Sequence, residues 1–118
     1  LNPDGSTGIH FIHDRGQGGV FSGGSRIPDT DGVLDGGVND YEFLDHKFRN
    51  FAANRYGYFH YTILPHAYAT NSTSSGQAEL PGDDMIVSLG CSHYDHFVAN
   101  TIAHEIGHNF DLRHGGGD

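Results

Sequence analysis

Residues 104–114 read His-Glu-Ile-Gly-His-Asn-Phe-Asp-Leu-Arg-His and contain the residue types of a catalytic metal site. His104 and His108 are four positions apart, so on a helix they lie on one face, one turn apart, and both imidazoles can bind the same ion. Glu105 lies beside that row, where its carboxylate can take a proton from water activated by the metal. The spacing therefore predicts a zinc site with a general base.

His114 is the candidate third ligand. It lies six residues after His108, and an unbroken helix would turn it far from the first two histidines, so the helix must end between them. Three neutral histidines leave the fourth position of zinc open for water, which makes such a site catalytic rather than structural. With ten histidines and three glutamates in 118 residues, random order gives His-Glu-x-x-His about 0.02 times, so chance is a weak explanation.

The motif resembles the metzincin signature His-Glu-x-x-His-x-x-Gly-x-x-His, which supplies three zinc ligands and the catalytic glutamate of a zinc endopeptidase. His104, Glu105, His108 and His114 match it position by position. Asp111 stands where that signature has the glycine that lets the backbone turn towards the third ligand. Aspartate enters left-handed backbone conformations more easily than most residues with a β-carbon, so we expect the turn to form.

The resemblance covers roughly the C-terminal half of the chain, where four segments look like secreted prokaryotic metzincin-like metallopeptidases. These segments are Gly57-Tyr-Phe-His-Tyr, Ala78-Glu-Leu-Pro-Gly, Ile86-Val-Ser-Leu-Gly and the zinc helix ending in Leu112-Arg-His-Gly-Gly-Gly-Asp118. The resemblance implies a secreted zinc endopeptidase that hydrolyses peptide bonds, with a protein or peptide as substrate.

Two further features follow from the resemblance. In metzincins a methionine-containing turn after the third histidine lies beneath the metal, but the only methionine here, Met85, lies upstream. We therefore expect the chain to represent the N-terminal subdomain, with a twisted sheet, a backing helix, an active-site helix and no methionine turn. In metzincins an edge strand just before the last strand of the sheet also pairs with extended substrate. The residues in that place here are Gln77, Ala78, Glu79 and Leu80.

The elements that must position the motif can be predicted from apolar spacing. A helix over 41–53 places Phe43, Leu44, Phe48, Phe51 and Ala52 on one face, and a second helix, capped by Ser92, His93 or Asp95 but not Tyr94, carries Phe97, Val98, Ile102 and Ile106. Residues 8–13, 56–68 and 85–89 favour strands, and 77–80 a short extended piece. The order predicts one α/β layered domain over residues 1–118, of the α+β kind with a mixed, zincin-like sheet.

Residues 28–40 form a predicted surface loop that is too polar to hold a core position. Its side-chain oxygens occur at intervals reminiscent of calcium loops without matching the EF-hand pattern. A calcium site and a solvated loop both remain open. The candidate ligands are Asp29, Asp31, Asp35, Asn39 and Asp40, followed by Glu42.

Composition limits the class of partner. Fifteen acidic against six basic residues give a net charge of −9, which disfavours nucleic acid and anionic membranes as partners. No apolar run has membrane-spanning length, and the single Cys91 excludes an intrachain disulfide. We expect a soluble, extracellular monomer that is a mature or trimmed chain. The alternatives to a zinc endopeptidase are a metal-binding domain without catalysis and a calcium-stabilised structural domain.

Overall fold

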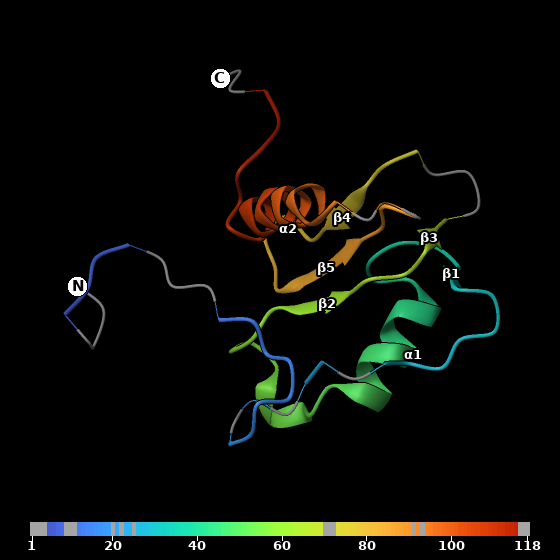
Figure 1. Ribbon diagram of the computed structural model, residues 1–118, viewed down its shortest axis with the longest axis horizontal. Helices are drawn as coiled ribbons and strands as arrows, with labels where there is room; N and C mark the ends of the chain where they lie inside the picture. Colours follow the sequence, from blue (N-terminus) through green and yellow to red (C-terminus); the bar gives the residue numbers. More distant parts are fainter. Residues whose placement is uncertain are drawn as a thin grey trace.

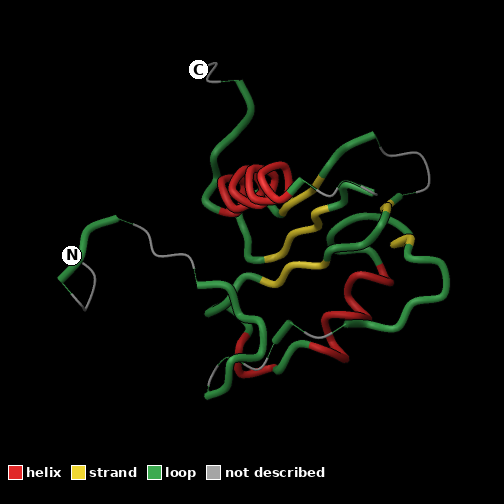
Figure 2. The backbone as a smooth tube through the Cα atoms, in the orientation of Figure 1, coloured by secondary structure: helices red, strands yellow, loops and turns green. Residues whose placement is uncertain are grey.

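The structure is a computed structural model in which two helices lie on opposite sides of a small sheet (Figures 1 and 2). It describes residues 5–8, 12–19, 21, 23–24, 26–69, 73–90, 92 and 94–115. The elements in chain order are β1 (Val33–Leu34), α1 (Tyr41–Asn50), a 3-10 turn (Ala53–Arg55), β2 (Tyr61–Ile63), β3 (Ala67–Tyr68), β4 (Gly76–Ala78), β5 (Asp84–Val87) and α2 (Asp95–Asn109). The predicted α+β class is confirmed.

The central sheet is mixed and has the strand order β2-β5-β4. Strand β2 runs parallel to β5 with Ile63 opposite Ile86, and β4 runs antiparallel to β5 with Gly76 opposite Val87. A separate parallel pair joins β1 to β3. Within the described part of the chain, β4 is therefore an edge strand, and the predicted short extended piece at 77–80 overlaps it.

The apolar core lies on the α1 side of the sheet. Phe43 of α1 is fully buried and meets Tyr61 of β2 edge to face, with ring centroids 5.6 Å apart. Side chains alternate along a strand, so Asp84 and Ile86 of β5 face α1 while Met85 and Val87 face α2. The core cluster consists of Leu34, Phe43, Phe51, Tyr61, Ile63, Tyr68 and Ile86.

Helix α1 is shorter than predicted. It ends at Asn50 rather than Ala53, and the Phe51 amide donates the closing hydrogen bond to the Lys47 carbonyl at 2.9 Å. Phe51 lies in the core as expected, but Phe48 is 81% exposed and Leu44 is also exposed. The apolar spacing predicted the helix correctly but overestimated the width of its buried face.

The prediction that residues 28–40 contain no core residue was wrong, because this segment includes strand β1. Leu34 is only 3% exposed, because β1 pairs with β3 and Leu34 lies opposite Tyr68. The preceding turn is made by carboxylates: Asp29 accepts hydrogen bonds from the Thr30 and Gly32 amides, and Asp31 accepts one from the Val33 amide. Polar side chains thus build the turn that places Leu34 in the core.

Other predicted elements differ in extent. The expected strand at 56–68 is interrupted, since only Tyr61–Ile63 and Ala67–Tyr68 are paired, and 85–89 is shifted to Asp84–Val87. Of the expected strand at 8–13, residues 8, 12 and 13 are not in a strand, and residues 9–11 lie outside the described residues. Tyr94 occupies the N-cap position of α2 without a side-chain cap bond, so the prediction of a polar cap was wrong. Cys91 also lies outside the described residues.

A buried ion pair joins the N-terminal loop to the 3-10 turn. Arg55 is buried between the rings of Phe51 and Phe59 and donates a hydrogen bond to Asp14. Burial acts to raise the pKa of the Asp14 carboxyl, but hydrogen bonds from the backbone and the Arg55 guanidinium outweigh it and hold that pKa below its usual value.

The described helices include none with the length and apolar character needed to cross a membrane.

Candidate metal centre

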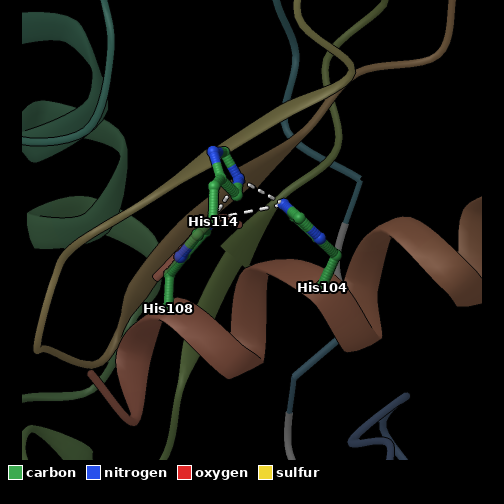
Figure 3. A group of neighbouring side chains, drawn as sticks. All are labelled: His104, His108 and His114. Atoms are coloured by element: carbon green, nitrogen blue, oxygen red, sulfur yellow. Dashed lines mark hydrogen bonds between the residues drawn. The ribbon is translucent and has the colours of Figure 1, made fainter. Parts of the chain in front are cut away.

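Three histidine side chains converge at the C-terminal end of α2 (Figure 3). The Nε2 atom of His104 lies 3.2 Å from that of His108 and 2.8 Å from that of His114, and the last two are 2.9 Å apart. His104 and His108 lie one turn apart on α2, while His114 is brought back after the helix ends. The three nitrogens predicted from the sequence as metal ligands therefore surround one point.

The donor set fits a zinc ion. A tetrahedral ion with Zn–N bonds of about 2.0–2.1 Å places its ligand nitrogens about 3.3 Å apart, close to the spacing seen here. His108 Nδ1 lies 2.7 Å from the Leu112 carbonyl oxygen, which can only accept a hydrogen bond. The proton therefore resides on Nδ1, and the Nε2 lone pair of His108 points towards the other two histidines. His104, His108 and His114 are thus able to hold a metal.

The sharp turn after α2 brings His114 back. The Phe110 amide donates to the Gly107 carbonyl at 3.1 Å, the Asp111 amide to the His108 carbonyl at 2.8 Å, and the Leu112 amide to the Gly107 carbonyl at 3.0 Å. Asp111 has a positive φ of 64°, in the left-handed region. The expected turn between the second and third histidines forms with aspartate in the place of the signature glycine.

Substitutions at Asp111 test how much this turn contributes. Asp111→Gly should leave the free energy of unfolding within about 1 kcal/mol of the wild type, because glycine adopts this φ without steric cost. Asp111→Val should lower it by about 1–2 kcal/mol and weaken zinc binding, because a β-branched residue resists the left-handed conformation. Urea denaturation and zinc titration of both variants measure the effect.

The glycine variant is also the control for the exposed ion pair between Asp111 and Arg113, whose charged atoms are 3.8 Å apart. Both substitutions remove this pair, which we expect to contribute little. A valine variant as stable as the glycine variant would show that the backbone conformation at residue 111 is unimportant.

Glu105 is buried and lines the same pocket as the three histidines. It is 4% exposed, although it belongs to the same helix as the largely exposed His104. Burial raises the pKa of the Glu105 carboxyl, while positive charge on His108 and His114 acts in the opposite direction. The side chain stands directly opposite Gly76 of β4. The arrangement places a carboxylate of increased basicity beside the three nitrogens.

A pocket of about 410 Å³ lies between α2 and the edge strand. Its wall on one side is β4, and Leu80, which follows the strand, is exposed at its margin. Of the four residues predicted to form the substrate-binding edge strand, Gln77 and Ala78 lie in β4, whereas Glu79 and Leu80 follow the strand. The pocket is lined by Ser74, Ser75, Gly76, Gln77, Ala78, Leu80, His104, Glu105, His108, Arg113 and His114.

The acidic loop uses its side chains differently from a calcium site. Besides the turns made by Asp29 and Asp31, Asp40 accepts a hydrogen bond from the Gly37 amide at 2.7 Å. The Asp35 amide itself donates to Glu42, and Asn39 has a positive φ of 71°. Among the described residues, the groups of side chains close enough to share an ion do not include these candidates. The structure does not bring them together, and calcium binding stays a prediction.

Asn109 is a site residue that the sequence reasoning missed. It is buried beside His108, and its Nδ2 donates to the carbonyls of Glu79 and Asp84, both at 3.1 Å. Its Oδ1 lies 2.8 Å from His60 Nδ1. The amide thus ties the end of α2 to the β4–β5 connection. Its position four residues after Glu105, on the same helix face, was the available signal.

A second cluster of possible ligands, Glu79, Asp83 and Asp84, lies near this connection. Asp84 is buried and forms an ion pair with Lys47 of α1, whose Nζ is also 3.7 Å from Asp83. Burial raises the pKa of the Asp84 carboxyl, although the hydrogen bond and charge of Lys47 partly offset this. With a lysine ammonium among its carboxylates, this cluster is a structural ion pair that joins α1 to β5.

Comparison with known proteins assigns the chain to a family. Searches of curated proteins and of solved structures found no match. Residues 46–115 match the family described as Metallo-peptidase family M12B Reprolysin-like, a stretch that begins in α1 and ends one residue after His114. The match covers more than half of the chain and includes the whole three-stranded sheet and the three converging histidines. The chain therefore belongs to the reprolysin-like M12B metallopeptidases and is a metzincin-type domain.

Proposed function

We propose that this chain is a zinc-dependent endopeptidase in which Glu105 acts as general base for the attack of water on a peptide carbonyl. The observation that carries the proposal is the convergence of three histidine nitrogens beside a buried carboxylate in one pocket. Zinc held by His104, His108 and His114 would polarise the substrate carbonyl and lower the pKa of water towards about 7.

Glu105 would move the proton in this reaction. Its carboxylate takes a proton from the attacking water, holds it in a largely desolvated position, and delivers it to the nitrogen of the leaving amine. Burial supports this role because it raises the pKa of the carboxyl and so makes it a better proton acceptor than an exposed glutamate. The Nδ1 hydrogen bond of His108 to the Leu112 carbonyl keeps that ring oriented throughout.

We further propose that extended substrate pairs with the outer side of β4. The Ser75 carbonyl accepts a hydrogen bond from the Ser88 amide, and the Glu79 amide donates one to the Asp84 carbonyl. In an antiparallel pair the residues that bond to the neighbouring strand alternate with residues that do not, so the backbone groups of Gly76 and Ala78 point away from β5. The Gly76 carbonyl already accepts hydrogen bonds from Tyr68 and Ser74. Ala78, next along the strand and in the pocket lining, is therefore the residue we expect to pair with the peptide backbone.

Metal removal tests the proposal. A chelator should abolish peptide hydrolysis, and one equivalent of zinc per chain should restore it, because the three ligands bind only as neutral imidazoles around one ion. His114→Ala should lower zinc affinity by at least about tenfold, since it removes one of three ligands. Zinc content by elemental analysis, zinc affinity by competition, and cleavage of a protein substrate are the measurements.

The same experiment separates the alternatives. Stoichiometric zinc without hydrolysis, in this chain and in any longer natural form of it, would favour a metal-binding domain without catalysis. Calcium without zinc after purification would favour a calcium-stabilised domain. Hydrolysis that survives complete removal of zinc would contradict the proposed mechanism.

A further inference from the structure

Gly76 of the edge strand faces the Glu105 side chain at a distance that leaves no room for a β-carbon. A Cβ atom built on Gly76 would lie 2.8 Å from Glu105 Cδ and 2.9 Å from Cγ, and closer still to Oε1. Real Cβ contacts are essentially never shorter than 3.0 Å. The carboxylate therefore occupies the space that any other residue at this position would fill.

Gly76 cannot easily shift to make that room. Its carbonyl accepts hydrogen bonds from the buried Tyr68 hydroxyl at 2.8 Å and from the Ser74 hydroxyl at 2.6 Å. On the other side the strand is paired with β5, where the Ser88 amide donates to the Ser75 carbonyl at 2.8 Å. The backbone at Gly76 is thus fixed from both sides of β4.

The partner in this contact is equally restrained. Glu105 is buried on α2, and the neighbouring Asn109 fixes the end of that helix to the β4–β5 connection. Helix and strand are both held by hydrogen bonds, so an added methyl group would displace the Glu105 carboxylate rather than either backbone.

We propose that Gly76 is a positioning residue for Glu105: its missing side chain, on a backbone fixed by Tyr68 and β5, sets where the carboxylate stands relative to the three histidines. This rests on the proposed function, in which Glu105 is the general base. A displacement of about 1 Å in a catalytic group can cost about a hundredfold in rate. The contact itself is a packing feature that exists whether or not the chain hydrolyses peptides.

Gly76→Ala tests the positioning role. We expect kcat to fall by about 10- to 100-fold with KM within about twofold of wild type, because the substitution moves the proton acceptor and not the metal ligands. Zinc should still bind at one equivalent per chain. The matched control is Gly57→Ala, a glycine outside the pocket lining where no atom lies within 4 Å of an added Cβ, so kcat should not change.

A stability cycle tests the contact independently of activity. Gly76→Ala should lower Tm by about 4 °C or more in the wild type, but by clearly less in a Glu105→Ala background, where the clashing side chain is gone. If wild type hydrolyses nothing, the proposed function fails and this comparison still decides the packing claim. Equal Tm losses in both backgrounds, wild-type kcat in Gly76→Ala, or loss of zinc from that variant would overturn the proposal.

Discussion

Glu105→Gln is expected to bind one zinc per chain and to lose peptide hydrolysis by at least about a hundredfold. The amide has the shape of the carboxylate, so it fits the same buried space opposite Gly76 and leaves the three histidines in place. It cannot accept a proton from water or return one to the leaving amine. The loss should appear in kcat, because the missing proton transfer occurs in the transition state and not in substrate binding.

The sequence offers a matched control for this variant. Glu42 lies on α1, on the far side of the sheet from α2, and Glu42→Gln makes the same chemical change there. We expect it to retain wild-type kcat and zinc content. Cleavage of a protein substrate by both variants, measured at equal zinc occupancy, decides the question. A Glu105→Gln variant that cleaves at the wild-type rate would exclude Glu105 as the base.

The convergence of the three histidines in the candidate metal centre could be predicted because its geometry is mostly local. Helical spacing places His104 and His108 on one face of α2, and the requirement that the helix end before His114 follows from rotation alone. The left-handed Asp111 was foreseeable from residue type. These features depend on a short stretch of backbone, which is why eleven consecutive residues were sufficient.

The surroundings of the centre could not be predicted, because they depend on contacts between distant segments. Gly76 lies 29 positions before Glu105, and nothing in the spacing of either residue indicates that they touch. The same is true of Leu34, which reaches the core only because β1 pairs with β3. Pairing over such separations is set by the whole fold and not by local periodicity.

The buried face of helix α2 could not be predicted from hydrophobicity alone, because its most buried residues are polar. Its buried residues are Glu105 and Asn109, while Phe97 is exposed. Apolar spacing located the helix, and Val98, Ile102 and Ile106 are half-buried, but it did not identify the two buried polar residues. A functional helix can turn its polar residues inwards when the interior supplies hydrogen-bond partners, as Glu79 and Asp84 do for Asn109.

Lys47→Ala should destabilise the fold by about 3–5 kcal/mol, the loss typical of removing one partner of a buried ion pair. Asp84 is 3% exposed, so without the ammonium its charge would remain in the interior without compensation. Burial already raises the pKa of Asp84, and removing Lys47 should raise it further. Below that raised pKa the folded state binds a proton that the unfolded state does not, so the destabilisation should diminish as the pH falls.

Arg49→Ala provides the comparison on the same helix. Arg49 forms an exposed ion pair with Asp45, with Nε and Oδ2 2.8 Å apart, and its removal should cost less than about 1 kcal/mol. Adding Asp84→Asn to Lys47→Ala should recover part of the loss and flatten its pH dependence, because no buried charge remains. Urea denaturation of the four proteins between pH 5 and about pH 8 measures both effects. A Lys47→Ala variant no less stable than Arg49→Ala would show that the Lys47–Asp84 pair does not hold α1 to the sheet.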